Sequence, residues 1–323
     1  MLNLKKLLRS FLIVLSSFFF GIIICETVLR IKHKIIINYD IEMWKYAKKL
    51  KYKVDNKKIN HIHIKNKSAI LQNTKIKINS YGQRDVEYDK SFLSKFDRSF
   101  LVLGSSVAMG WGVEEEKVFS RRLNKKSLEN NKNWIFINGG IGNHNTKRYV
   151  NNYLTNWSEL EFTDIIINFF VNDTEILLDK KTNFLIKHSH LAVVIWKFIK
   201  SYKSNLSEKN LENYYKRLYE NNFVGFIQAK SYLSKLNNHC KINNINCSLY
   251  NMPDIHQLNP YKLNFINKKM SVFSKSIDLE YYDLLNLFEG LSEKKFSNDY
   301  NDNHPNFHAH NLIGMSIFEN LIK

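Results

Sequence analysis

Cysteine is scarce in this chain, with three among 323 residues. Cys25, Cys240 and Cys247 are too few for a disulfide framework, and their spacing does not form the C-x-x-C pattern of a metal site. Cys240 and Cys247 could pair in an oxidising compartment, but we favour two unpaired, half-buried thiols. Because 44% of the residues are hydrophobic and 14% are aromatic, the chain can bury a substantial core, which argues against disorder.

Acidic residues are also in short supply, with 30 Asp and Glu against 48 Lys and Arg, for a net charge of +18. Such a charge suits nucleic acid, an anionic membrane surface or an acidic polysaccharide. However, the lysines are scattered among asparagines and isoleucines, with no basic block and no RNA-binding signature. We therefore predict a solvated basic surface and no nucleic-acid partner.

The N-terminal segment lacks the small residues of a signal-peptidase site. Residues 11–25 are uncharged and almost wholly apolar, and the flanking residues bring the run near the ~20 residues of a membrane span. We predict a cytoplasmic tail over residues 1–9, an uncleaved transmembrane signal anchor over residues 10–29 and a connecting region over residues 30–97. His61 and His63 in that region are interpreted as surface histidines.

Short apolar runs alternate with helical stretches from residue 98 to the C-terminus. The expected strands are 100–103, 134–138, 164–171, 246–252 and 279–285. A helix over 108–125 is expected after the first strand, and a helical insertion around 185–237. This alternation predicts an α/β domain over residues 98–323, with a parallel sheet of about five strands wound on both faces.

Polar or small residues follow three of the expected strands. Ser106 comes after the first strand, Gly142 and Asn143 after the second, and Asn172 after the third. In parallel α/β sheets, ligands bind at the carboxyl ends of the strands. We therefore expect these residues to converge at one edge of the sheet, and the loop before the last helix could reach the same edge.

That last loop carries Asp302 and His304, which complete a set suited to acyl transfer. His304 can accept the proton of Ser106 and return it to the leaving alcohol, while Asp302 orients the imidazole. The expected oxyanion-hole donors are the N–H of Ser106, an N–H of the Gly142–Asn143 loop and the Asn172 amide. The reaction needs no cofactor or metal.

Four stretches resemble, in order, the blocks of the SGNH/GDSL hydrolase superfamily: Gly104–Ser106, Asn138–Thr146, Val171–Asp173 and Asp302–Asn306. The resemblance is closest to the membrane-anchored bacterial branch. It implies a flavodoxin-like three-layer α/β/α domain, held periplasmic or extracellular at the bacterial inner membrane by the N-terminal helix. It also implies a serine esterase that hydrolyses or transfers small acyl esters, often acetyl groups on carbohydrate, so that the expected partner is an acyl ester, with acetylated polysaccharide as a candidate.

Three positions depart from the pattern of this superfamily. Ser105 stands where an aspartate is usual, and Phe170 where the third block usually begins with glycine. In the second block, either Gly142 or Asn143 aligns with the glycine that supplies an oxyanion donor.

Alternative interpretations remain at this stage. His304, His308 and His310 are close enough in sequence to form a zinc site with one open position, and His256 is another candidate base. The replacement at Ser105 also keeps open a catalytically inactive, membrane-tethered carbohydrate-binding module of the same fold. Retention of serine, imidazole and both carboxamide and carboxylate partners favours the enzyme.

Overall fold

The computed structural model describes residues 2–177, 184–205, 211–255, 258–299 and 302–323. These residues form two compact units. The first combines Met1–Lys48 with Lys180–Lys209, and the second combines Lys49–Asp179 with Asn210–Lys323. Residues 49–97, expected as part of a connecting region, therefore fold in the same unit as the sheet.

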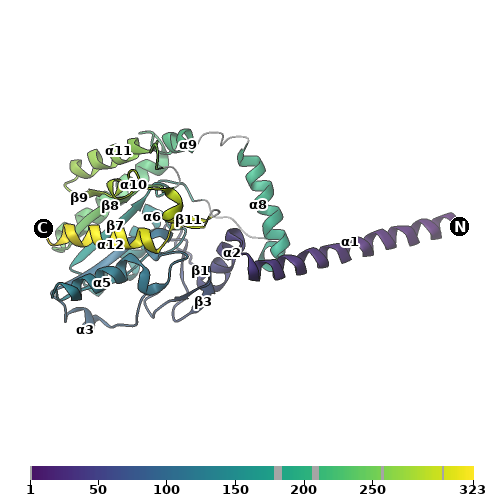
Figure 1. Ribbon diagram of the computed structural model, residues 1–323, viewed down its shortest axis with the longest axis horizontal. Helices are drawn as coiled ribbons and strands as arrows, with labels where there is room; N and C mark the ends of the chain where they lie inside the picture. The colour runs from purple at the N-terminus through teal and green to yellow at the C-terminus, as the bar shows by residue number, and fades with distance from the viewer. Residues whose placement is uncertain (1, 178–183, 206–210, 256–257, 300–301) are drawn as a thin grey trace. The chain divides into compact units, whose positions relative to one another are not determined.

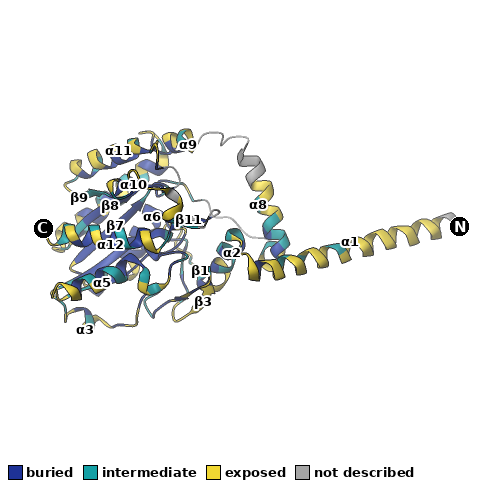
Figure 2. Cartoon of the chain, in the orientation of Figure 1, coloured by how far each residue is buried: buried dark blue, intermediate teal, exposed yellow. Residues whose placement is uncertain are grey.

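The first unit is helical. It contains α1 (Leu2–Ile35), most of α2 (Tyr39–Leu50), α7 (Phe184–His188) and α8 (His190–Asn205). Within α1, the 32 residues of Leu4–Ile35 are long and apolar enough to cross a membrane, by length and composition. The apolar side chains along this helix are exposed (Figure 2).

A five-stranded parallel sheet forms the centre of the second unit, in the order β6-β5-β7-β8-β9. Its strands are β5 (Arg98–Gly104), β6 (Trp134–Asn138), β7 (Asp164–Phe170), β8 (Asn246–Met252) and β9 (Glu280–Asp283). Six of the seven residues of β7 are buried, as expected for a parallel strand that is covered on both faces. The predicted α/β class and all five expected strands are confirmed.

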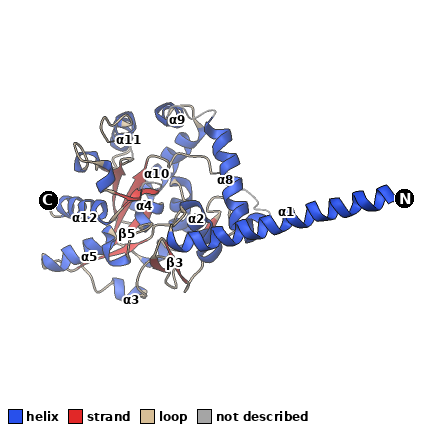
Figure 3. Cartoon of the chain, turned by 45° about the vertical axis from the view of Figure 1, so that its right-hand side comes forward, coloured by secondary structure: helices blue, strands red, loops and turns tan. Residues whose placement is uncertain are grey.

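Helices cover both faces of this sheet (Figures 1 and 3). Leu101 and Leu103 of β5 pack in one core with α6 (Thr146–Asn156) and α10 (Val224–Ile242). Phe100 and Val102 pack in the other core with α5 (Phe119–Glu129) and α12 (Phe307–Leu321). This alternation follows from the two-residue period of a strand. The helices and 3₁₀ turns of the second unit are α3 (Lys90–Leu93), α4 (Ser106–Met109), α5 (Phe119–Glu129), α6 (Thr146–Asn156), α9 (Leu211–Leu218), α10 (Val224–Ile242), α11 (Asn264–Ser276), α12 (Phe307–Leu321) and the turns Glu115–Lys117, Ser158–Leu160, Leu285–Leu287 and Glu293–Lys295.

Three antiparallel pairs of short strands accompany the sheet. They are β1 (Lys51–Lys53) with β2 (His61–His63), β3 (Ser68–Leu71) with β4 (Thr74–Lys77), and β10 (Ser297–Asp299) with β11 (Asp302–Pro305). The β3–β4 hairpin closes through Gln72 and Asn73, whose φ angles are 50° and 56°. Two positive φ angles in a two-residue loop are typical of a hairpin whose turn matches the twist of its strands.

The start of α12 fixes where β11 ends. The Asn306 side chain accepts hydrogen bonds from the N–H groups of His308 and Ala309, at 3.0 and 3.3 Å. Such a cap satisfies donors that the first helical turn cannot pair internally. The segment 302–305 is therefore held between a strand partner and a capped helix.

Cys240 and Cys247 form a disulfide, contrary to the expectation of two free thiols. Cys240 lies near the end of α10 and Cys247 near the start of β8, so the turn between helix and strand brings the two sulfur atoms together. The sequence separation of seven residues gave no indication of this helix-to-strand return.

Candidate active site

Ser106 lies at the junction between β5 and α4, where it is the first residue of that short helix. The glycine before the two serines is required by its surroundings: a Cβ on Gly104 would come within 2.8 Å of the Asn168 carbonyl oxygen and of the Ala108 Cβ. Helix α4 ends at Gly110, whose φ of 80° is in the left-handed region. The expected helix over 108–125 is consequently divided into α4 and α5.

The expected hydroxyl, imidazole and carboxylate lie in one hydrogen-bonded row. His304 Nε2 is 2.8 Å from Ser106 Oγ, and His304 Nδ1 is 2.7 Å from Asp302 Oδ1. Asp302 also accepts a hydrogen bond from the backbone N–H of His304 at 3.2 Å, and its side chain is nearly fully buried. With the Nδ1 proton directed to Asp302, Nε2 is the acceptor for the Ser106 hydroxyl.

The second oxygen of Asp302 has two further donors that the sequence analysis missed. The indole Nε1 of Trp111 donates to Asp302 Oδ2 at 3.1 Å, and Gln72 Nε2 donates to the same oxygen at 3.2 Å. Trp111 stands between Gly110 and Gly112, both with positive φ, in the break between α4 and α5. These two donors hold Oδ2 while His304 contacts Oδ1, so the orientation of the carboxylate is fixed and that of the His304 ring is restricted.

The second-block loop lies directly against the serine helix. The N–H of Ile141 donates to the Gly104 carbonyl at 3.2 Å. A Cβ on Gly140 would lie 2.2 Å from the backbone nitrogen of Met109. Only glycine permits this close approach, which places the Gly142–Asn143 segment beside the end of β5.

The Gly142 carbonyl is held by groups from the β1–β2 hairpin. His61 Nε2 lies 3.0 Å from this oxygen, and Lys51 Nζ donates to it at 3.4 Å. Because a trans peptide points its C=O and N–H in opposite directions, the N–H of Asn143 is directed away from the hairpin. Gly142 itself is buried, whereas Asn143 is exposed and has a φ of 70°.

Asn172 follows β7 and is half-buried. Its loop is tied to the second block, because the N–H of Thr146 donates to the Asp173 carbonyl at 3.3 Å. Among the described residues, the Asn172 carboxamide has no hydrogen-bond partner. The predicted residues from the ends of β5, β6 and β7 thus lie on loops of three adjacent strands, at the carboxyl edge of the sheet.

A buried arginine outside the four blocks supports the serine helix. Arg84 is 1% exposed and donates to the carbonyls of Met109, Gly110 and Val113, at 3.0, 2.6 and 2.7 Å. These carbonyls lie at and just after the end of α4, beyond the regular hydrogen bonds of the helix. Nothing in the local sequence pattern indicates which helix end this arginine meets.

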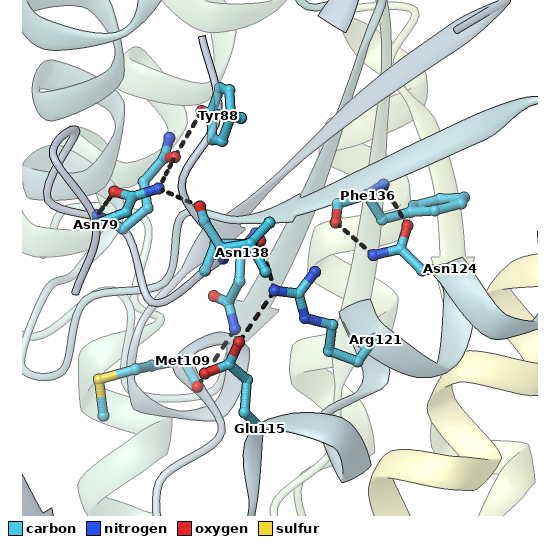
Figure 4. A network of polar contacts seen from close by, with 11 residues as sticks. Asn79, Tyr88, Met109, Glu115, Arg121, Asn124, Phe136 and Asn138 are labelled. Atoms are coloured by element: carbon cyan, nitrogen blue, oxygen red, sulfur yellow. Dashed lines mark hydrogen bonds and ion pairs between the residues drawn. The ribbon is translucent and has the colours of Figure 1, made fainter. Parts of the chain in front are cut away.

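Asp85, the next residue, connects this support to β6. Its carboxylate accepts a hydrogen bond from the N–H of Asn138 at 2.8 Å and pairs with Arg121 at 2.7 Å. Burial raises the pKa of Asp85 to about 6, against the attraction of Arg121. Arg121 Nη2 also lies 3.0 Å from Glu115 Oε1. Figure 4 shows this ion pair beside Asn138 and Met109.

His61 and His63 are buried, so their interpretation as surface histidines is wrong. In β2 the two histidines face inward and Ile62 is the more exposed residue, which inverts the usual polar-outward alternation. His63 Nδ1 lies 3.0 Å from the Gly82 carbonyl oxygen. Burial lowers the pKa of His63 to about 3 and lowers that of His61 well below its ordinary value.

The three histidines considered for zinc have separate surroundings. His310 is buried, stacks on Phe119 and accepts a hydrogen bond from its N–H at 3.3 Å, while His308 is exposed. Across the described ranges, no group of three or more His, Cys, Asp or Glu is arranged to hold a metal ion. His256 lies outside the described residues.

Comparisons with known proteins give structural likenesses at low sequence identity. No protein-family model and no curated protein matches the sequence. Many solved structures are similar to the chain, including the following three. The psychrotrophic esterase EstA from Pseudoalteromonas sp. has a TM-score of 0.45 and 13% identity, over 70% of this chain and 97% of that one. A putative lipolytic protein of the G-D-S-L family from Desulfitobacterium hafniense has a TM-score of 0.44 and 12% identity, over 69% of this chain and 99% of that one. A mutant of an acetyl-xylooligosaccharide esterase from Geobacillus stearothermophilus has a TM-score of 0.47 and 11% identity, over 69% of this chain and 94% of that one.

The sheet and its helices form a three-layer α/β/α domain. The first three of the four stretches follow adjacent strands of the parallel sheet, and the fourth, just before α12, meets the first through the contact of His304 with Ser106. The four stretches that resemble the SGNH/GDSL blocks therefore lie together at the carboxyl edge of this sheet.

Proposed function

We propose that this protein is a serine ester hydrolase in which Ser106 is the nucleophile, His304 the general base and Asp302 the residue that orients the base. The observation that carries the proposal is the hydrogen-bonded row of Ser106 Oγ, His304 Nε2 and Nδ1, and Asp302 Oδ1, at 2.8 and 2.7 Å. A nucleophile within reach of a base that is itself held by a third group is the general arrangement for acyl transfer.

In the first half-reaction, Ser106 Oγ attacks the ester carbonyl and His304 Nε2 takes its proton. The tetrahedral intermediate then expels the alcohol, which receives that proton, and an acyl-Ser106 ester remains. In the second half-reaction, His304 takes a proton from water as the water attacks the acyl-enzyme, and the acid leaves as Ser106 is reprotonated. If a sugar hydroxyl replaces the water, the same steps transfer the acyl group.

We assign the oxyanion hole to the N–H of Ser106, the N–H of Asn143 and the side-chain amide of Asn172. The assignment of Asn143 rather than Gly142 is supported by the Gly142 carbonyl, which His61 and Lys51 hold on the opposite side of the shared peptide. Losing one such donor typically costs about 3–4 kcal/mol of transition-state stabilisation.

We further propose that α1 anchors the protein in the bacterial inner membrane, with residues 1–9 in the cytoplasm, residues 10–29 in the bilayer and the domain from residue 98 onward outside the cytoplasm. The length and apolar composition of α1 support an anchor. The Cys240–Cys247 disulfide supports an oxidising compartment for the domain. A small acyl ester, acetyl on carbohydrate in particular, is the proposed substrate class.

The test is covalent labelling of the full chain in detergent by a fluorophosphonate, together with hydrolysis of p-nitrophenyl acetate. We expect labelling and turnover in the wild type and in Ser105→Ala, and neither in Ser106→Ala. Ser105 is a matched control because it is the adjacent buried serine, outside the hydrogen-bonded row. Turnover that survives Ser106→Ala and disappears with a chelator would indicate metal chemistry, and absence of both signals in the wild type would indicate a binding module.

A further inference from the structure

Helices α7 and α8 expose a row of large apolar side chains. Ile195, Phe198 and Ile199 of α8 are all exposed, and Phe198 is 70% exposed. Their spacing of three and four residues puts them on one face of the helix. Trp196 borders this face, and Phe184 of α7 is 73% exposed. We call these residues, together with Leu185, the apolar face of α7–α8.

Another side of α8 is attached to the rest of the first unit. Lys197 forms an ion pair with Asp40 of α2 at 2.5 Å. Val193 is buried, and His190 packs against Trp44, with ring centroids 5.5 Å apart. The apolar face is therefore a surface left over after α8 has packed within its unit.

The start of α8 is fixed on α1 by Glu26. This carboxylate accepts hydrogen bonds from the N–H groups of His190 and Leu191, at 3.1 and 2.9 Å, and from the Ser189 hydroxyl at 2.8 Å. Arg30, one helical turn further along α1, donates to the His188 carbonyl at 3.1 Å. Two N-terminal N–H groups of α8, the hydroxyl of the preceding Ser189 and the carbonyl of His188 are thus satisfied by α1.

The position of Glu26 determines at which point along α1 the start of α8 is attached. It is the first charged residue after the uncharged run of residues 11–25. Charged side chains are strongly disfavoured in the hydrocarbon centre and are placed near the boundary of the bilayer. From that point α8 runs across the direction of α1 in both views (Figures 1 and 3).

We propose that α7–α8 lies in the surface of the lipid bilayer that α1 spans, with its apolar face against the acyl chains. The occupant is lipid because α8 begins beside Glu26, directly after the apolar run of α1, so that a helix starting there lies at the boundary of the bilayer that α1 spans. Trp196 suits the headgroup level, and Lys200, whose Nζ lies 5.8 Å from the Trp196 ring centroid, suits anionic phosphates. The proposal rests on the membrane anchor proposed above.

The test uses the full chain in nanodiscs that hold one copy each, with lipids brominated near the glycerol end of the acyl chain. Quenched tryptophan emission is compared among the wild type, Trp196→Phe and the control Trp134→Phe, which alters a half-buried tryptophan of β6. We expect the quenched emission to fall about twofold in Trp196→Phe and not in the control. Equal quenching in the two variants would overturn the proposal.

A second measurement reports on a single labelled position and needs no difference between the tryptophan emissions of two variants. An environment-sensitive NBD label at Phe198→Cys, in a Cys25→Ser background, is compared with the same label at Val272→Cys, an exposed apolar position of α11. We expect a blue shift on transfer from detergent to the disc at 198 alone, and equal emission at both positions contradicts the proposal. A blue shift at 198 that needs two copies per disc assigns the face to a second chain instead. Loss of co-elution with the discs indicates failure of the anchor and not of α7–α8.

Discussion

Replacing Gln72 with glycine separates two effects of this residue: the conformational cost of its backbone in the β3–β4 turn and the hydrogen bond of its side chain to Asp302. Gln72 occupies a left-handed position, with a φ of 50°, and its amide donates to Asp302 Oδ2 at 3.2 Å. A left-handed backbone costs a residue with a Cβ about 1–2 kcal/mol. Glycine relieves this strain but loses about 0.5–1 kcal/mol through the added freedom of the unfolded chain. The hairpin alone would therefore be slightly more stable with glycine.

The hydrogen bond to Asp302 reverses that balance. A hydrogen bond to a charged group contributes about 1.5–3 kcal/mol, so Gln72→Gly should lower the free energy of unfolding by about 1.5 kcal/mol in total. If half of the bond energy, about 1.1 kcal/mol, acts in the transition state, kcat falls about sixfold with KM unchanged.

The control is Asn73→Gly, at the neighbouring turn position with a φ of 56° and an exposed side chain. It changes the backbone in the same way and leaves Asp302 untouched, so we expect a stability change within about 0.5 kcal/mol and wild-type kinetics. The assays are urea unfolding and p-nitrophenyl acetate hydrolysis from pH 5 to 9. Equal kinetics in the two variants would refute the positioning role of Gln72.

Three further predictions concern the support of the site. Gly140→Ala should abolish fluorophosphonate labelling, because its Cβ would lie 2.2 Å from the Met109 nitrogen; wild-type labelling rates would contradict this packing argument. Arg84→Lys keeps the charge but cannot reach all three carbonyls, so the free energy of unfolding in a urea titration should drop by about 2–4 kcal/mol. An unchanged urea midpoint would show that Arg84 does not support the end of α4. Burial lowers the pKa values of His63 and His310 to about 3. The unfolded chain therefore binds protons below about pH 6.5 that the folded chain does not, and each histidine should remove about 2 kcal/mol of stability between pH 7 and 5. Stability that is constant over this range would show that the two groups are not neutral in the fold.

The sheet and the hydrogen-bonded row were accessible from the sequence because their signals are local. Buried parallel strands such as β7 leave near-continuous apolar runs, and each block follows directly from the end of a strand or precedes a helix. Ser106, His304 and Asp302 are found through such short patterns, even though 198 residues separate the first two.

The donors around Asp302 have no comparable local signal. Gln72 is a turn residue in a short hairpin, and its reach to Asp302 depends on a contact across 230 residues of sequence. Trp111 was placed inside a continuous helix, because periodicity alone does not register that Gly110 and Gly112 both adopt positive φ. The burial of His61 and His63 has no sequence signal, because the β1–β2 hairpin packs polar side chains against the Gly142–Asn143 loop. In an ordinary half-buried strand, alternation places the apolar residues inward and the polar residues outward.

The path of the chain between its two units bears on how the protein responds to proteases. The polypeptide crosses from one unit to the other after residues 48, 179 and 209. A cut at the first crossing leaves the sheet-containing unit joined through the chain to α8, which hydrogen bonds to Glu26 and the ion pair of Lys197 with Asp40 hold against α1 and α2. A protein joined to its anchor by a single crossing is released by one cleavage. Under the anchoring proposed above, the sheet-containing unit of this chain is released only when the contacts of Glu26 and Asp40 open or the remaining two crossings are also cut.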